Sequence, residues 1–359
     1  MYGGRSTLTH SQLCSLADIM RFRVADCFHV ILSLSVILLL VVVRFKLPNK
    51  THVINTKPPE PKRQSVTLDD GVFTYHLNLS HFQDEFPHLQ SYNCSLIYTP
   101  RPDNGGASPL LLLAIKSHPA SVSRRAALRK TWAKPVEVMG YRVRPVFLMG
   151  LSDHNKHMEL VKVEETEYGD ILLWNFTEGH HNLSLKERCL LEWLHYNPSQ
   201  ATFIFKGDDD VFVNPAALVQ YIKVNASSPS TLHGALQRHS IVLRYSKYQV
   251  SRTLFSNTKY PYFLSGGGFL FPGAAVPPLY HASLRLPVFP LDDVYFGILS
   301  LAANLTLRHE NRFYVFGLKF DPCNYRRAFV VHRVEPDYLL RIWGQVHEAK
   351  CNSTEPNNK

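Results

Sequence analysis

Charged residues are scarce in this 359-residue chain, making up 19% of it against 45% hydrophobic residues. A chain with so little charge and so much apolar surface to bury is not disordered over its whole length. The 18 glycines and 23 prolines show no triplet period, which excludes a collagen-like protein. Six cysteines are too few for a disulfide-held mini-protein, although they suffice for a few bridges.

The charge that is present is unevenly balanced, with 39 Lys and Arg against 29 Asp and Glu, a net +10. Such a surplus indicates an anionic partner, which could be nucleic acid, a membrane surface or a phosphorylated small molecule. The length alone fits one large domain or two modest ones.

One long apolar run lies near the amino end, at 28–43, with basic residues on both sides. Extended back to residue 24 it reaches about twenty residues, enough to span a bilayer. A cleaved signal peptide is the main alternative, but the run ends in Val-Val-Val-Arg with no small-residue cleavage site. A buried core helix is less well supported, because the polar first 20 residues offer it no partner. We therefore expect a transmembrane signal anchor at 24–43.

N-glycosylation signals are more frequent than chance allows. Eight Asn-X-Ser/Thr sites occur in the chain, where its composition predicts about two. Each alone could be an unmodified surface asparagine, but together they predict that everything after the anchor is luminal. This predicts a single-pass type II membrane protein with no nucleic-acid partner. The sites are Asn49, Asn78, Asn93, Asn175, Asn182, Asn225, Asn304 and Asn352.

The predicted organisation has four parts: a cytosolic tail at 1–23, the anchor at 24–43, a Pro-rich luminal stem at 44–92 and one luminal catalytic domain at 93–359. The four luminal cysteines lie in an oxidising compartment and could form two disulfides in any of three pairings. They are Cys94, Cys189, Cys323 and Cys351.

Strand and helix patterns alternate from residue 110 to residue 224. This alternation predicts an α/β fold with a mostly parallel central sheet and helices on both faces. Strands are expected at 110–115, 143–149, 170–175 and 201–205, and helices at 121–132, 153–167, 183–196 and 215–224. After residue 230 the pattern is less regular.

Three carboxylates, Asp208, Asp209 and Asp210, directly follow an apolar strand and precede Val-Phe-Val. Ligands bind at the carboxyl ends of parallel strands, and three carboxylates held there need a cation. Oxygen ligands favour Mg²⁺ or Mn²⁺, which usually also hold substrate phosphates. A solvated acidic turn is the plainer alternative, but the apolar flanks argue against it.

A second acidic pair, Asp292 and Asp293, lies between apolar segments. One carboxylate could act as a general base on an attacking hydroxyl, or both could simply cap a helix. Upstream, Gly267 and Gly268 belong to a glycine triplet that would let the backbone approach a ligand closely, or form a flexible turn.

Basic residues cluster just after the first predicted strand. Arg125 and Arg129 lie near a helix amino end, where a diphosphate could bind, although a solvated helix face would look the same. Near the other end, His332 is a candidate metal ligand, and a lone histidine is often structural instead.

Six motifs occur in an order that resembles the inverting β-1,3-glycosyltransferase family of the Golgi, which includes β-1,3-galactosyl- and β-1,3-N-acetylglucosaminyltransferases. The resemblance covers about 109–345. The triple glycine followed by Phe-Leu, and Asp-Asp-Val rather than Glu-Asp-Val, is more similar to the N-acetylglucosaminyl branch. The motifs are RRAALRKTWA (124–133), VFLMG (146–150), YGDILLWNFTEGHHNLSLK (168–186), FKGDDDVFVNP (205–215), YPYFLSGGGFLF (260–271) and PLDDVYFG (290–297).

The resemblance implies a GT-A nucleotide-sugar fold, a UDP-sugar donor, Mn²⁺ and a galactose-terminated glycan acceptor on a glycoprotein or glycolipid. It implies that Asp208 and Asp209 face the nucleoside and sugar, and that Asp210 binds the metal, with His332 completing its shell. It also implies that Asp293 is the base with Asp292 beside it. The expected activity is β-1,3 transfer of N-acetylglucosamine from UDP-GlcNAc to the 3-hydroxyl of galactose.

Two departures from the family pattern limit what carries over. Ile298-Leu299 stand where many relatives have a cysteine, so the family disulfide pairing cannot be copied, and Gly207 replaces Thr or Val, which should loosen the loop before the triplet. Two other functions remain open: a β-1,3-galactosyltransferase using UDP-Gal, and an inactive glycan-binding membrane protein. The sequence does not decide between a monomer and a homodimer.

Overall fold

A computed structural model describes residues 65–102, 106, 108–197 and 201–351. The predicted cytosolic tail and the predicted anchor at 24–43 lie outside these residues. Among the helices that are described, none is both long and apolar enough to cross a bilayer.

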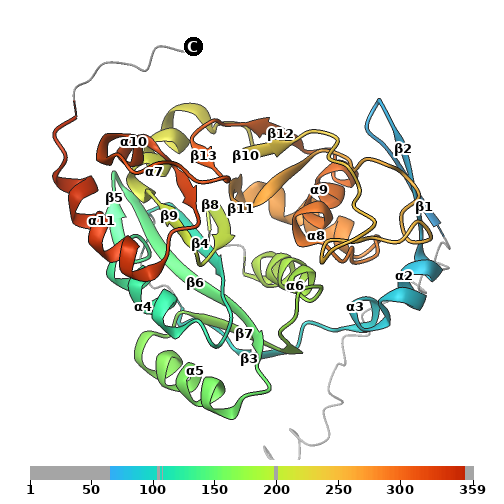
Figure 1. Cartoon of the computed structure of the whole chain (residues 1–359), viewed down its shortest axis with the longest axis horizontal. Helices are drawn as coiled ribbons and strands as arrows, with labels where there is room; N and C mark the ends of the chain where they lie inside the picture. Colours follow the sequence, from blue (N-terminus) through green and yellow to red (C-terminus); the bar gives the residue numbers. More distant parts are fainter. Residues whose placement is uncertain (1–64, 103–105, 107, 198–200, 352–359) are drawn as a thin grey trace, which may run out of the picture. The chain divides into compact units, whose positions relative to one another are not determined.

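A twisted sheet forms the centre of the domain (Figure 1), and its strand order is β12-β10-β11-β8-β4-β6-β7-β3, with β5 paired to β6. The four predicted strands are present as β8, β4, β6 and β7, which are parallel neighbours. The remaining strands make the sheet mixed rather than mostly parallel, because β11, β3 and β5 pair antiparallel with their neighbours. The strands are β3 (Leu96–Tyr98), β4 (Leu110–Lys116), β5 (Val136–Val138), β6 (Tyr141–Leu151), β7 (Ile171–Thr177), β8 (Phe203–Asp208), β10 (Thr231–Gln237), β11 (Phe263–Pro272) and β12 (Thr306–His309).

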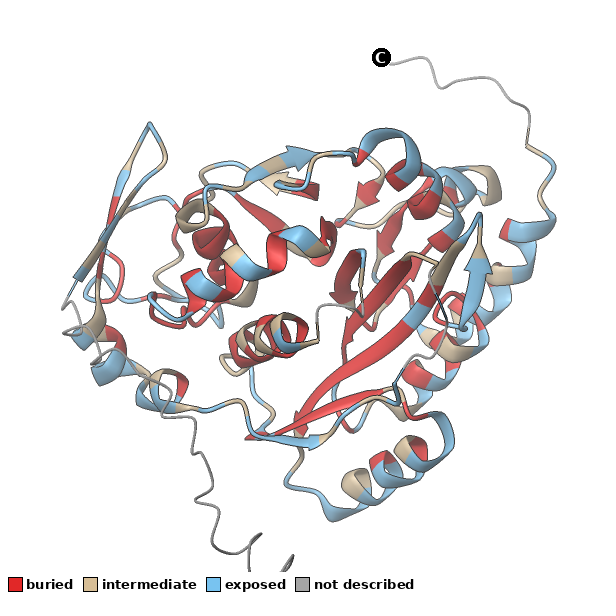
Figure 2. Cartoon of the chain, turned by 180° about the vertical axis from the view of Figure 1, so that it is seen from behind, coloured by how far each residue is buried: buried red, intermediate tan, exposed pale blue. Residues whose placement is uncertain are grey.

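Helices cover both faces of this sheet, as predicted, and bury two separate apolar layers (Figure 2). Alternate residues of β4 show the division. Leu112 and Ala114 pack toward α6, α8 and α9, whereas Leu111 and Leu113 pack toward α4, α5, α7 and α11. These helices are α4 (Val122–Lys130), α5 (Asn155–Tyr168), α6 (Leu183–Tyr196), α7 (Pro215–Asn225), α8 (Val276–Ser283), α9 (Asp292–Ala302) and α11 (Pro336–Glu348), with a 3₁₀ turn at Gly273–Ala275 before α8.

A small three-stranded sheet lies beside the main one. It contains β9 (Val211–Val213), β13 (Phe313–Tyr314) and β14 (Val330–His332), and α10 (Pro322–Arg327) precedes β14. In the antiparallel β9–β14 pair, Val211 lies opposite His332. This register carries His332 to the turn formed by Asp209 and Asp210.

The predicted stem at 44–92 extends too far along the chain, and its part at 44–64 lies outside the described residues. Residues from Ser65 onward form β1 (Ser65–Asp69), β2 (Thr74–Asn78), α2 (Leu79–Glu85) and α3 (Pro87–Ser91). Tyr75, Leu77, Phe82 and Leu89 from these elements are fully buried in the core beside α8 and α9. The folded unit therefore begins before residue 93, because short amphipathic pieces within a polar segment supply core side chains.

Four of the cysteines form two disulfides, as predicted, and the structure selects one of the three pairings. Cys94 is joined to Cys189, which ties β3 to α6, and Cys323 is joined to Cys351, which ties α10 to the end of α11.

Candidate active site

The site is built where β4 and β8 end. In their parallel register Lys116 lies beside Asp208, and the Nζ atom of Lys116 is 2.9 Å from Oδ1 of Asp208. The strand runs further than predicted, so Asp208 is its last residue, whereas Asp209 and Asp210 form the turn into β9. The side chain of Asp209 is buried and is held by Ser117 Oγ (2.7 Å) and by Arg124 (3.1 Å).

Asp208, Asp210 and His332 form a cluster whose three potential ligand atoms all lie within 4.8 Å of one another. Nε2 of His332 lies 3.4 Å from Oδ1 of Asp210, a buried oxygen that accepts no hydrogen bond. On the other side of the ring, Nδ1 of His332 donates to the carbonyl oxygen of Val315 (3.0 Å). That bond puts the proton on Nδ1 and leaves the Nε2 lone pair facing the carboxylates. Two carboxylates and one imidazole fit a divalent cation such as Mn²⁺.

Asp292 and Asp293 occupy the first turn of α9, where negative charge interacts favourably with the helix dipole. Asp292 forms an ion pair with Lys116 at 2.5 Å, and the positive charges of Lys116 and Lys206 overcome its burial and hold its pKa well below the usual range. Asp293 has no such partner. Burial, together with the charge of Asp292, raises the pKa of Asp293 to about 7. Two adjacent carboxylates thus have opposite tendencies, one permanently ionised and the other able to exchange a proton near neutral pH.

A buried ion pair lies behind Asp292. Nζ of Lys206 is 2.6 Å from Oε1 of Glu187 and 4.0 Å from Oδ2 of Asp292, and neither Lys206 nor Glu187 reaches solvent. The ammonium group of Lys206 also lies 4.8 Å from the centre of the Phe269 ring. Lys116 and Lys206 therefore supply fixed positive charge to the acidic pair on α9.

A cavity of about 420 Å³ opens over the aspartate triplet. Its size is in the range of small-molecule sites in proteins. Three cations, four imidazole or hydroxyl side chains and four carboxylates face it. Asp292 and Asp293 are not among the residues that line it, and they lie beyond Lys116. The lining residues are Lys116, Ser117, His118, Ser121, Arg124, Glu178, Gly179, His180, Leu183, Lys186, Asp208, Asp209 and Asp210.

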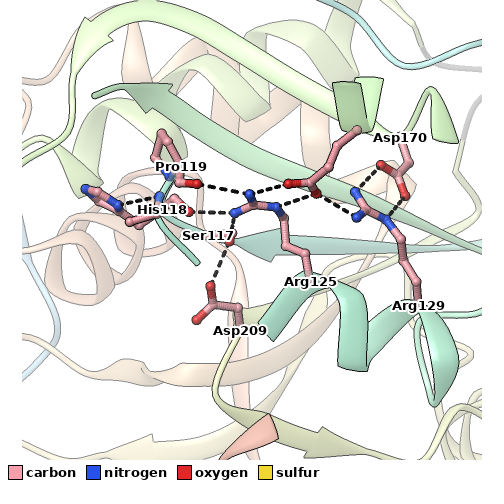
Figure 3. A network of polar contacts seen from close by, with 9 residues as sticks. Ser117, His118, Pro119, Arg125, Arg129, Asp170 and Asp209 are labelled. Carbon is pink, nitrogen blue, oxygen red and sulfur yellow. Dashed lines mark hydrogen bonds and ion pairs between the residues drawn. The ribbon is translucent and has the colours of Figure 1, made fainter. Parts of the chain in front are cut away.

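Arg125 and Arg129, predicted to bind a diphosphate, do not face this cavity (Figure 3). The guanidinium of Arg125 is fully buried and bonds to Glu164, to Ser117 Oγ and to the carbonyls at 118 and 119. Arg129 makes a two-bond contact with Asp170 and a further bond to Glu164. The prediction is wrong for these two side chains, because every donor direction of Arg125 is already used inside the protein.

Arg124 is the arginine of this motif that reaches the cavity. It lies near the start of α4, bonds to Asp209 and reaches Glu335. Arg124 belongs to the basic stretch predicted as a diphosphate site, but Arg125 and Arg129 were the residues named for binding, and no role was predicted for Lys116 or Lys186. A signal for Lys116 was available, since a lysine that ends a continuous apolar strand is expected at the ligand-binding edge of the sheet.

Gly267 and Gly268, predicted to let the backbone approach a ligand, do not line the cavity. At Gly268 an added Cβ would lie 3.0 Å from Phe205, so the missing side chain makes room for that ring, whereas at Gly267 it would be in ordinary contact with His332 at 3.6 Å. Gly266 is the glycine beside Asp293 and Lys116. Gly207 does not loosen a loop. It is part of β8, where a Cβ would lie 2.8 Å from Phe205.

Acidic side chains at the carboxyl ends of parallel strands, beside a basic helix start, are typical of proteins that bind phosphorylated ligands with a divalent cation. The galactosyltransferase family matches residues 123–311, more than half of the chain. This protein belongs to that family of glycosyltransferases.

Characterised relatives cover most of the chain. A human acetylgalactosaminyl-O-glycosyl-glycoprotein β-1,3-N-acetylglucosaminyltransferase is 36% identical over 259 residues, which is 68% of this chain and 67% of that protein. A rat UDP-GlcNAc:betaGal β-1,3-N-acetylglucosaminyltransferase 7 is 33% identical over 300 residues, 76% of this chain and 75% of its own. A mouse N-acetyllactosaminide β-1,3-N-acetylglucosaminyltransferase 2 is 31% identical over 327 residues, 85% of this chain and 81% of that protein. The predicted resemblance is confirmed, and these relatives are all in its N-acetylglucosaminyl branch.

Proposed function

We propose that the protein transfers N-acetylglucosamine from UDP-GlcNAc to the 3-hydroxyl of a terminal β-galactose, with inversion, giving a β-1,3 linkage. The names of its relatives support the donor and the linkage. The observation that carries the chemistry is the pairing of an ionised Asp292 with an Asp293 whose pKa is raised to about 7.

The donor half of the site is the cavity over the triplet. Arg124 and the amino end of α4 border it and suit a diphosphate. Asp208, Asp210 and His332 would hold Mn²⁺, which, when bound, supplies positive charge against the negative charge that UDP carries as it leaves. Asp209, fixed by Ser117 and Arg124, has its carboxylate buried at the wall of the cavity.

The acceptor half is the start of α9. Asp293 removes the proton from the galactose 3-hydroxyl while that oxygen forms its bond to the anomeric carbon of the donor. The bond from that carbon to the UDP oxygen breaks in the same displacement, and the electron pair leaves with UDP. Because attack and departure are on opposite faces, an α-linked donor gives a β-linked product. Lys116 and Asp292 set the charge environment of Asp293.

The test is a donor panel. The full chain is assayed with UDP-GlcNAc, UDP-Gal and other UDP-sugars against a β-galactoside acceptor, with and without Mn²⁺. We expect Mn²⁺-dependent transfer with preference for UDP-GlcNAc. Preference for UDP-Gal would make the protein a β-1,3-galactosyltransferase. No transfer from any donor would sink the enzymatic proposal and favour an inactive glycan-binding protein.

We further propose a GT-A architecture and a single-pass type II location in the Golgi membrane, with the catalytic unit in the lumen. Exposure of glycosylation signals supports the luminal placement: of the six that fall within described residues, Asn93, Asn175, Asn225 and Asn304 are exposed. The other two, Asn78 and Asn182, are half-buried, and their side-chain amides are hydrogen-bonded. Treatment of the full-length protein with an N-glycosidase would test this topology: a drop in apparent mass shows N-glycans and hence a luminal catalytic unit, and an unchanged mass contradicts it.

A further inference from the structure

The segment 238–262, which joins β10 to β11, has an unusual composition. It contains five lysines and arginines, four tyrosines and no aspartate or glutamate. Neither the aspartate triplet nor the acidic pair on α9 accounts for this composition. We call it the basic–aromatic segment.

This segment is folded, not a loose loop. Ile241 and Lys259 form an antiparallel bridge, and Arg244 donates bonds of 2.7 to 2.9 Å to four carbonyl oxygens of the same segment. Five of its apolar side chains are buried in the core, so the segment is anchored from below. They are Val242, Val250, Leu254, Phe255 and Tyr260. The backbone that carries the outward-pointing side chains is therefore held in place by hydrogen bonds and core packing.

Several of the exposed side chains of the segment are aromatic or positively charged. Tyr245 is 70% exposed and Tyr248 is 45% exposed. The remaining four basic side chains of the segment are exposed, and within the described part of the chain none of them has an acidic ion-pair partner. These are Arg238, Lys247, Arg252 and Lys259. An unpaired cation beside an aromatic ring, as Lys247 is beside Tyr248, favours an anionic ligand with a flat, partly apolar face.

The basic–aromatic segment borders the site at two points, one near its middle and one at its carboxyl end. The Tyr248 ring contacts the ring of His180 edge-on at 5.4 Å, and His180 lines the cavity over the triplet. Lys247 lies 4.9 Å from the centre of the Tyr248 ring, so a cation is close to the same rim. At the other end, the Tyr262 carbonyl packs against Gly297 of α9, the helix that begins with the proposed base.

We propose that the basic–aromatic segment binds the acidic part of the acceptor glycan, in the form of sulfate esters or carboxylates on sugars inward from the terminal galactose. The proposal rests on the function proposed above and adds the chemical class of the acceptor. The tyrosines can cover the apolar faces of sugar rings, while the lysines and arginines pair with the anionic groups. A neutral glycan would need only the tyrosines, and the four unpaired cations indicate an acidic one.

The test compares matched acceptors on the full chain, with UDP-GlcNAc as donor. The first is a neutral galactose-terminated oligosaccharide, the second carries a sulfate ester on its inner N-acetylglucosamine, and the third carries an inner glucuronic acid. We expect kcat/KM for the sulfated acceptor to exceed that for the neutral one by about fivefold, since two exposed ion pairs each give a modest gain. The preference should reside in KM and shrink as salt is raised.

The matched variants are the double substitution Lys247→Gln and Arg252→Gln, and Lys162→Gln as control. Lys162 is an exposed lysine of α5, on a helix distant in the fold from the basic–aromatic segment. We expect the double variant to bring the sulfated-to-neutral ratio of kcat/KM close to one, and the control to keep the wild-type ratio. Equal melting temperatures would show that both variants are folded.

The outcomes separate the two proposals. Equal use of neutral and acidic acceptors by the wild type, or an unchanged ratio in the double variant, overturns the role of the basic–aromatic segment while transfer itself persists. Loss of transfer to every acceptor contradicts the proposed function instead. Preference for the sulfated acceptor alone assigns the surface to sulfate, and equal preference for the glucuronic acid acceptor assigns it to anionic sugars in general.

Discussion

Lys116 at the end of β4 forms an ion pair with Asp292 at the start of α9, its Nζ atom 2.5 Å from the Oδ2 atom of the aspartate. The same ammonium group contacts Asp208 at 2.9 Å. Burial alone would lower the pKa of Lys116, but the two carboxylates outweigh it and raise the pKa well above its ordinary value. One charged lysine therefore joins the cluster that we propose for metal binding to the acidic pair that we propose for acceptor activation.

The pH dependence of catalysis should follow Asp293. Its pKa is raised to about 7, and a base must be deprotonated to act, so kcat/KM should increase as pH rises through about 7. Initial rates across a pH series at saturating donor measure this. A flat profile over that range would argue against Asp293 as the titrating base.

Removing the charge of Lys116 should shift that profile. The lysine lowers the pKa of Asp293, opposing burial and Asp292, so Lys116→Met should move the midpoint of kcat/KM to higher pH. The variant also removes the ion-pair partner of Asp292, so the melting temperature of the variant should be measured alongside. Lys162→Met, on the exposed face of α5, is the control and should leave the midpoint in place. An unchanged midpoint in a folded Lys116 variant would contradict the coupling.

Asp293→Asn should remove the base with little change in shape. We expect kcat to fall by about a hundredfold to ten-thousandfold, the usual contribution of general base catalysis. UDP affinity, measured by calorimetry, should stay close to wild type because Asp293 does not line the donor cavity. Full activity in this variant would disprove the assignment.

Sequence patterns predicted the strands and helices that local periodicity specifies, including the four parallel strands and the bounds of α6. They did not predict which arginines are available to bind a ligand and which are paired inside the protein. Arg125 and Arg129 are one helical turn apart on the inward face of α4, so they are taken by Glu164 and Asp170, and the neighbouring Arg124 faces the cavity. That distinction depends on what packs against the helix, which the sequence of the helix does not contain.

The candidate site was predicted in its acidic parts and missed in its basic ones. Asp208, Asp210 and His332 come together as expected, through the β9–β14 register. Lys116 was missed because its role arises from pairing between β4 and β8, a long-range register. The start of the fold was predicted too late for a similar reason. Tyr75 and Phe82 are isolated apolar residues in a polar stretch, and only their burial against distant parts of the chain shows that they belong to the core.

Metal binding should depend on Asp210. Asp210→Ala deletes a carboxylate whose Oδ1 atom is buried and without a hydrogen-bond partner, so Mn²⁺ affinity in the presence of UDP should fall by at least about tenfold. Calorimetric titration with Mn²⁺ measures it without relying on turnover. Asp337→Ala, which changes an acidic residue of α11, is a suitable control. Unaltered Mn²⁺ affinity in the Asp210 variant would remove this residue from the metal site.

Two adjacent arginines should have different roles, Arg125 in the stability of the fold and Arg124 in binding of the donor. Arg125→Ala leaves Glu164 buried with one partner fewer, and breaking such a pair costs about 3–5 kcal/mol of unfolding free energy. Arg124→Ala, at a partly exposed position on the cavity wall, should instead weaken UDP binding and lower the melting temperature less than Arg125→Ala, because Asp209 keeps its bond from Ser117. Thermal unfolding and UDP titration of both variants test this. The reverse pattern would restore the sequence-based assignment of Arg125 to the diphosphate.

The account is tested most directly by the structure of the reaction product. Wild-type protein is incubated with UDP-GlcNAc, Mn²⁺ and a β-galactoside, and the product is examined by NMR for the anomeric configuration and the linkage position. The account predicts N-acetylglucosamine in β configuration on carbon 3 of galactose. An α linkage, attachment at another carbon, or no product would contradict it.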